Sequence, residues 1–226
     1  MRNFKSFVFC STGMFFSIIC LASVKNTHHD FSTASWGGGE ICITCHTPHN
    51  ANMTVPQSPL WNHAVTVNAF SLYSSNTLDS ISSQPTGITR LCLSCHDGTI
   101  ALDSFGGNAG TEYIRIQTSR NVPIRIGSNL SNHHPVAIVY DSAVAASDPG
   151  LYDPSVTPSG LGGTIETDLL NNGVLECSSC HDVHVPRGTG NCTDCHDFSY
   201  PSYYLNTKSL FKSNVGSALC FTCHKK

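Results

Sequence analysis

Ten cysteines of this chain form five pairs with the same spacing, and a histidine follows each pair at once. The five motifs are Cys42–Cys45–His46, Cys92–Cys95–His96, Cys177–Cys180–His181, Cys192–Cys195–His196 and Cys220–Cys223–His224. In a C-x-x-C-H motif the two thiols lie on one side of a helical turn, and the next side chain is an imidazole, a common metal ligand. This spacing suits covalent haem, because the thiols add to two vinyl groups and the histidine becomes the proximal ligand of the iron. The sequence therefore predicts five haem c groups.

Three other uses of paired cysteines explain the pattern less well. A disulfide framework accounts for the cysteines but not for the histidine after every pair. Structural zinc sites need four ligands, and five Cys-Cys-His triplets do not divide into such sets. A dithiol redox centre usually occurs once in a protein, and it does not require the histidine. We therefore favour covalent haem over all three.

The remaining histidines are numerous enough to supply a second axial ligand for each iron. They are His28, His29, His49, His63, His133, His134 and His184. Adjacent residues rarely bind two irons, so the two doublets leave five groups for five haems. The sequence after residue 23 contains a single methionine, Met53, so two histidines per iron are the expected ligation. Haem of this kind lacks the methionine ligand that raises the potential, and we expect low reduction potentials.

Two of these histidines follow a motif histidine by three residues. His49 follows His46, and His184 follows His181. A tether this short cannot reach the opposite face of the same haem, so each should serve a neighbouring haem and draw two haems close together. Aspartates 97, 182 and 197 directly follow motif histidines, and we expect them to cap turns rather than to orient an imidazole.

The first residues are typical of an export signal. Arg2 and Lys5 precede an apolar run over 7–19, and small residues follow at Ala22 and Ser23. We expect a signal peptide over 1–23, and one pentahaem domain over 24–226. An uncleaved membrane anchor and a lipid anchor at Cys20 are the alternatives, and both fit the flanking residues less well.

The rest of the chain predicts a fold that is mostly irregular. Single helical turns are expected at the motifs and a longer helix over 207–223. A small β-hairpin is expected over 112–117 and 122–126, a short strand over 136–140, and an exposed loop over 147–164. About 40 residues for each haem are too few for an ordinary core, so we expect the haems to nucleate the fold and fill its interior.

Several phrases between the motifs resemble a known family. They are His29-Asp-Phe-Ser, Cys45-His-Thr-Pro-His-Asn-Ala, Pro59-Leu-Trp-Asn-His, Cys92-Leu-Ser-Cys-His-Asp-Gly-Thr, His134-Pro-Val and Cys177-Ser-Ser-Cys-His-Asp-Val-His. These are similar to the extracellular multihaem cytochromes that polymerise into nanowires. The resemblance implies that His29 and His134, rather than His28 and His133, are axial ligands. Five haems depart from the haem counts of the best-known members.

The resemblance also implies partners. In filaments of that kind a histidine of one subunit can complete a haem of the next. His29 lies near the expected mature N-terminus, so we expect it to ligate a haem in the adjacent subunit of a head-to-tail homopolymer. Other redox proteins or extracellular electron acceptors are the further partners expected.

The expected function is electron transfer along a chain of haems, in an exported protein of an extracellular filament or the periplasm. A discrete periplasmic shuttle that feeds a reductase is the alternative. A multihaem oxidoreductase is less favoured, because catalysis needs an open iron position and five distal groups are available. We therefore expect no enzyme activity. The net charge of −3 gives no basic surface for nucleic acid.

Overall fold

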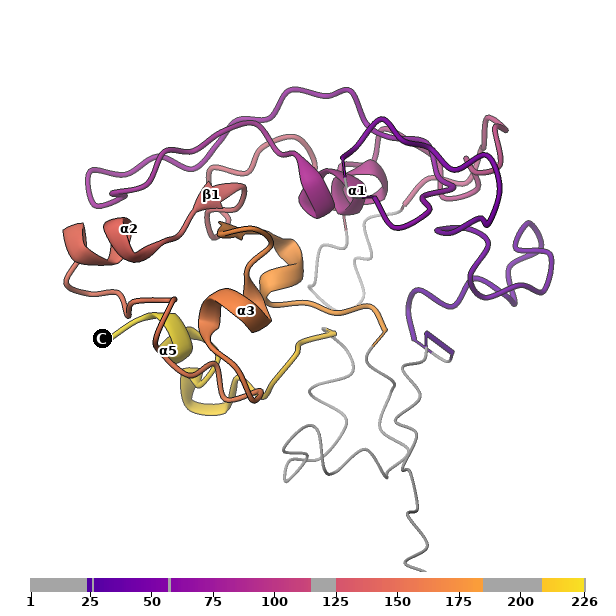
Figure 1. Ribbon diagram of the computed structural model, residues 1–226. Coiled ribbons are helices and arrows are strands. Elements are labelled where there is room, and N and C mark those ends of the chain that lie inside the picture. The colour runs from indigo at the N-terminus through magenta and orange to yellow at the C-terminus, as the bar shows by residue number, and fades with distance from the viewer. Residues whose placement is uncertain (1–23, 26, 57, 115–124, 185–208, 226) are drawn as a thin grey trace, which may run out of the picture.

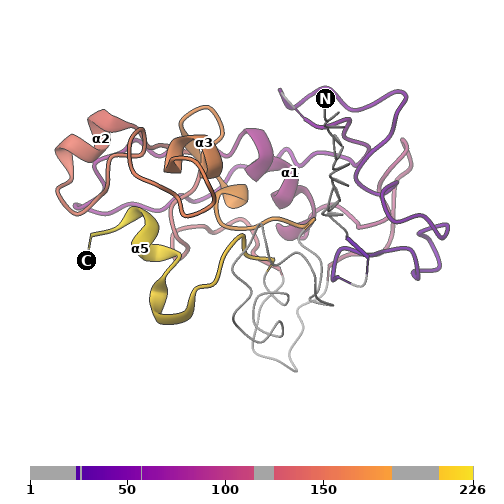
Figure 2. The ribbon, with the colours of Figure 1, turned by 60° about the horizontal axis from the view of Figure 1, so that its bottom comes forward.

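The structure is a computed structural model, and it describes residues 24–25, 27–56, 58–114, 125–184 and 209–225. Within these ranges the chain is mostly irregular, with short helices and one small sheet (Figure 1). Helices α2, α3 and α5 gather on one side, the segment that follows residue 24 occupies the other, and α1 lies between them (Figures 1 and 2). The expected fold class of coil with short helices is confirmed at this level.

The helices and strands are all short. In chain order the described elements are α1 (Gly87–His96), β1 (Ile138–Val139), α2 (Ser142–Ser147), α3 (Ile165–Leu169), β2 (Val174–Leu175), the 3-10 turns η2 (Cys177–Ser179) and η3 (Val215–Ser217), and α5 (Cys220–Cys223). Strands β1 and β2 pair antiparallel, with Ile138 opposite Leu175 and Val139 opposite Val174. Most of the positioning of side chains must therefore come from loops that are pinned at single points.

Helix α1 is the longest described element, and a distant residue caps its start. Thr86, the residue before the helix, makes no side-chain cap. The carboxyl of Glu176 instead accepts a hydrogen bond of 2.8 Å from the backbone N–H of Ile88. Such an acceptor satisfies a backbone donor that the first turn leaves free. The first turn of α1 is therefore tied to the residue that directly precedes the third motif.

Helices α2 and α3 carry their own start signals. The Asp141 side chain accepts a hydrogen bond from the N–H of Val144 at the start of α2. Thr164 and Thr167 form a reciprocal capping pair at the start of α3. The loop expected over 147–164 begins one residue too early, because Ser147 ends α2, and residues 148–164 are irregular.

Two small apolar clusters make up the described core. One joins β1, α3 and β2, with Ile165 fully buried at its centre. The other packs Leu93 of α1 against Phe70 and Leu130. Neither cluster is large, which agrees with the expectation that side chains alone supply little of the interior.

Two expectations about secondary structure need correction, and a third is largely untested. The strand expected over 136–140 is reduced to Ile138–Val139, because it pairs with the equally short β2 and otherwise meets Ser82 in a single antiparallel bridge. The helix expected over 207–223 is not continuous in its described part, because Gly216 and Ser217 adopt positive φ values of 60° and 64° and break the helix before α5. The hairpin over 112–117 and 122–126 falls largely outside the described residues, and its described ends form no strand.

No helix in the described part of the chain is long and apolar enough to cross a membrane. The expected signal peptide over 1–23 lies outside the described residues.

Candidate functional site

The four described motifs share one local backbone turn. In the first, third and fifth motifs the N–H of the histidine donates to the carbonyl of the first cysteine, at 2.8 Å for His46, 3.0 Å for His181 and 3.0 Å for His224. The second motif lies in the last turn of α1. Residues three apart in such a turn lie on the same face, so each pair of thiols faces one side of its turn. The fourth motif, Cys192–Cys195–His196, lies outside the described residues.

A distant segment pins the backbone of each motif histidine that the structure describes. Isolated antiparallel bridges join His46 to Trp61, His181 to Leu210 and His224 to Leu151. The N–H of Ile126 donates to the carbonyl of His96 at 2.7 Å. Each bridge is flanked by two backbone hydrogen bonds, such as Asn62 N–H to Cys45 carbonyl at 2.9 Å. Sequence reasoning did not find these anchoring segments, because a single bridge leaves no periodic pattern.

The described cysteines form no disulfide. Burial raises the pKa of Cys45 to about 11, that of Cys95 to about 12 and that of Cys223 to about 11. A dithiol redox centre depends on a lowered thiol pKa, so these three thiols do not suit that chemistry. They are neutral groups in apolar surroundings, where a thioether also fits.

The second and third motifs lie against each other. The pKa of Cys92 is raised well above its usual range. The largest cause is a side-chain hydrogen bond with Cys177, and burial is the next largest. The N–H of Cys177 also donates to the hydroxyl of Thr89 in α1, at 3.1 Å. Together with the Glu176 cap, these contacts hold the two motifs side by side.

Three motif histidines each have another histidine as a ring neighbour. The ring centres of His96 and His29 are 6.0 Å apart, those of His46 and His184 are 6.2 Å apart, and those of His224 and His134 are 6.2 Å apart. His29 and His134 are the members of the two doublets that the family resemblance favoured as ligands. The structure thus brings together six of the histidines that the sequence singled out.

Backbone and carboxylate oxygens hold one ring nitrogen in several of these side chains. Nδ1 of His46 lies 2.6 Å from the carbonyl oxygen of Pro59, and Nδ1 of His134 lies 2.9 Å from that of Pro135. Metal-bound histidines commonly donate their second N–H in this way, which fixes the tautomer and leaves Nε2 to the metal. These two rings are therefore prepared for ligation through Nε2.

The aspartates that follow motif histidines have two different roles. Asp97 is buried and accepts hydrogen bonds from Thr66 and Thr99, so it organises the turn after α1 as expected. Asp182 accepts the backbone N–H of His184 at 2.8 Å and also contacts its Nδ1 at 3.1 Å. Asp182 therefore caps a turn and orients an imidazole, whereas capping alone was expected. Asp197 lies outside the described residues.

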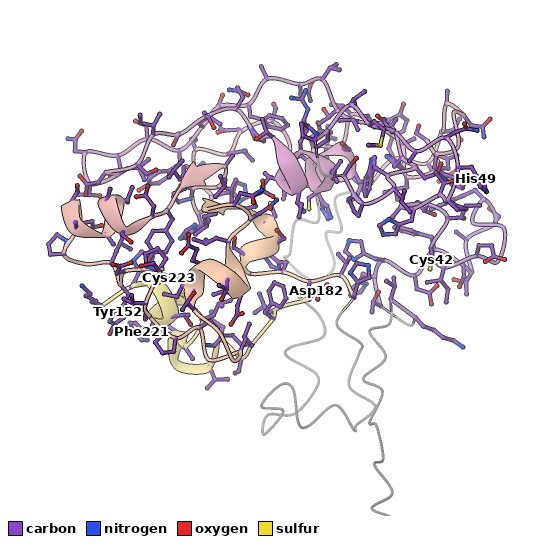
Figure 3. The ribbon with its side chains drawn as sticks, viewed as in Figure 1. Cys42, His49, Tyr152, Asp182, Phe221 and Cys223 are labelled. Atoms are coloured by element: carbon purple, nitrogen blue, oxygen red, sulfur yellow. The ribbon has the colours of Figure 1, made fainter. Side chains whose placement is uncertain are left out.

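The other expected ligands, His49 and His63, occupy contrasting places. His63 is buried, and its Nδ1 and Nε2 each lie 2.9 Å from a carbonyl oxygen, those of Ala64 and Ala101. His49 is exposed on the outer side of the segment that carries Cys42 (Figure 3). The role of both as ligands stays a prediction.

Buried polar atoms without partners test whether these surroundings fit a haem. Among the described residues, His29 Nδ1, Thr44 Oγ1 and Trp61 Nε1 are buried without a hydrogen-bond partner. Thr44 lies inside the first motif, and Trp61 packs on His46 with ring centres 6.4 Å apart. A buried polar atom of this kind is costly in a finished fold. The buried atoms without partners lie at the first motif and at His29. The residues there therefore fit the surroundings of a further bound group.

The fifth motif borders an open hollow of about 440 Å³. Tyr152, Lys212 and Phe221 are among its lining residues, and Figure 3 shows Tyr152 and Phe221 beside Cys223.

No three His, Cys, Asp or Glu side chains converge on one point within the described ranges. The metal-binding side chains that do meet are the histidine pairs.

Residues 184–226 match the protein family described as the doubled CXXCH motif. This segment contains the fifth motif and also the fourth, which lies outside the described residues. No curated protein sequence matches the chain. The doubled motif indicates covalent binding of haem c, so the chain carries a haem-binding region of the c-type cytochrome kind, which points to electron transfer.

Proposed function

We propose that this protein transfers electrons along five haem c groups, each held by two thioethers and by two axial histidines. The observation that carries this proposal is the repeated local geometry. Every described motif presents two cysteines and a histidine from the same turn, and a remote segment pins the histidine. Haem supplies reversible one-electron chemistry when it is bound in this way.

The packing of the motifs supports transfer between haems within one chain. The second and third motifs are in contact through Cys92 and Cys177. The first motif approaches the third through His46 and His184, whose ring centres are 6.2 Å apart with the ring planes at 24°. In Figure 3 Asp182 lies between Cys42 and Cys223, which places the third motif in the middle of the described set. Closely spaced haems allow electrons to pass without a diffusing carrier.

The polypeptide holds each iron environment rigid, which suits electron transfer. Carbonyl or carboxylate oxygens fix the rings of His46, His134 and His184. Two histidines on each iron leave no position for a substrate, so we propose no enzymatic reaction.

Assembly into an extracellular filament is the finer part of the proposal, and it rests on the family resemblance of the phrases between the motifs. Export of the chain is proposed on the same footing, from the basic and apolar residues of 1–23. A discrete periplasmic shuttle would use the same haems, so the two assemblies differ only in quaternary structure.

Haem stoichiometry is the decisive experiment. Protein made in a host that attaches haem c should gain the mass of five haems, and its alkaline pyridine spectrum should give five haem c per chain. A colourless protein, or one with an intact disulfide for each pair of cysteines, would overturn the proposal. Electron microscopy of the same preparation then separates filaments from single particles.

A further inference from the structure

The three histidine ring pairs have almost the same separation. Each pair joins one motif histidine to one histidine outside the motifs, with ring centres 6.0 or 6.2 Å apart. The partners come from distant parts of the chain, since His29 meets His96, His46 meets His184 and His134 meets His224. Chain connectivity therefore does not explain why each pair meets.

The separation matches two imidazoles on opposite sides of one metal. A metal–nitrogen bond of about 2 Å, with each ring centre about 1.1 Å behind its bonded nitrogen, places the two ring centres about 6.2 Å apart. Ordinary aromatic contacts span about 4.5–7 Å, so the distance alone does not decide the matter. The angles of 54°, 24° and 72° between the ring planes are all compatible with one axis through both rings.

The hydrogen bonds of the rings provide a second and independent observation. In the pair of His46 and His184, Pro59 and Asp182 hold the two Nδ1 atoms at 2.6 and 3.1 Å. Nδ1 of His134 is held by Pro135 at 2.9 Å. An imidazole with Nδ1 occupied keeps Nε2 free for a metal, as a ligand requires. An aromatic contact alone would not need this arrangement.

His29 supports the same conclusion in a different way. The residue is half-buried and its ring lies beside His96, and its buried Nδ1 finds no hydrogen-bond partner. A buried imidazole without a partner is unfavourable unless a further group binds the ring. A haem iron between His29 and His96 would provide such a group if His29 binds it through this Nδ1.

We infer that His29 and His96, His46 and His184, and His134 and His224 are the axial pairs of the second, first and fifth haems. This pairing rests on the proposed function, because it requires haem at these motifs. It places His29 on a haem of its own chain, whereas the sequence favoured a haem of the neighbouring subunit. It also leaves His49 and His63 for the third and fourth haems.

Single substitutions of the non-motif histidines test the inference. His29→Ala, His134→Ala and His184→Ala should each keep five haems, and each should bind one equivalent of carbon monoxide per chain after reduction. Added imidazole should restore the low-spin spectrum. The matched controls are His28→Ala and His133→Ala, the neighbours in the two doublets, and they should bind none. The measurements use the monomer, so that a ligand from a second subunit is absent.

The outcomes separate this inference from the proposed function. Wild-type protein without five haems would defeat the proposed function. Five haems together with carbon monoxide binding in His28→Ala or His133→Ala, and not in their neighbours, would defeat the pairing alone. Wild-type monomer that already binds carbon monoxide, with no increase in His29→Ala, would place His29 on another subunit.

Further variants test which motif histidine is the partner of His184. Replacing Cys42 and Cys45 by Ala removes the first haem, and adding His184→Ala should then open no new binding site. The same His184→Ala change should still open one in a chain that lacks Cys220 and Cys223. If these chains do not fold, NMR of the single His184→Ala variant gives the same information. The hyperfine-shifted signals of the haem bound to Cys42 and Cys45 should change, and unchanged signals there would refute this pair.

Discussion

Gly87, at the start of α1, provides a sharp test of how the second and third motifs are joined. Its φ is +51°, and a Cβ at this position would clash with Oε1 of Glu176. Glu176 is buried, and its carboxyl would have to move away from the N–H of Ile88 to admit the new Cβ. Gly87→Ala should therefore displace the carboxyl and break its 2.8 Å hydrogen bond to Ile88.

The expected cost has two parts. A non-glycine residue in the left-handed region costs about 1–2 kcal/mol. Loss of a hydrogen bond to a buried carboxyl costs a further 1–3 kcal/mol or so. Gly87→Ala should thus lower the free energy of unfolding by about 2–5 kcal/mol.

The control and the assay isolate the cost of losing the hydrogen bond to the Glu176 carboxyl. Gly107 is exposed and has a φ of +81° with nothing within 4 Å of an added Cβ, so Gly107→Ala measures backbone strain alone. Guanidinium unfolding of the haem-loaded variants, followed by circular dichroism, gives both free energies. In a Glu176→Ala background, Gly87→Ala should cost no more than Gly107→Ala does. Equal costs for the two glycines in the wild-type background would refute the reasoning.

Three further predictions concern potential, pH and ligand access. Asp182→Asn should raise the midpoint potential of one haem by about 40 mV, which is about 1 kcal/mol for one electron, because His184 loses a carboxylate that makes it a stronger ligand. Redox titration measures the change, and Asp79→Asn, at an exposed position, should leave all potentials in place. Burial raises the pKa of Glu176 in the folded protein, so the protonated carboxyl stabilises the fold. This contribution is lost as the pH rises from the unfolded-state pKa of about 4.3 through the higher folded pKa. Unfolding free energies over this range should therefore fall more steeply for wild type than for Glu176→Gln, and parallel curves would contradict the assignment. Reduced wild-type protein should bind almost no carbon monoxide by difference spectroscopy if two histidines fill each iron as proposed, and an equivalent bound per chain would instead favour an open, catalytic site.

The local parts of the candidate site could be predicted from the sequence, because their determinants are local. The spacing of Cys42, Cys45 and His46 requires a single helical turn, and the structure has this turn in every described motif. Composition likewise predicted coil with short helices. The short capped helices α2 and α3 were missed, since six and five residues are too few to show a periodic pattern.

The long-range parts could not be predicted, because they depend on single contacts between distant segments. Nothing in the sequence around Trp61 or Leu210 marks either residue as the bridge partner of a motif histidine. The cap that Glu176 gives to α1 spans 88 positions between the carboxyl and Ile88. The resemblance selected His29 and His134 within their doublets, and only the structure set each beside a particular motif histidine.

The positions of these contacts explain how a chain with so little core can hold several motifs in a fixed arrangement. The apolar cluster around Ile165 lies near the third and fifth motifs, and the cluster around Leu93 lies at the second. Neither includes the first motif, which is held by its bridge to Trp61 and by the contact of His46 with His184. If the iron joins these two rings, the cofactor provides a cross-link where side-chain packing is weakest. Haem attachment and tertiary structure are then coupled, and the first motif should depend on its haem more than the other described motifs do.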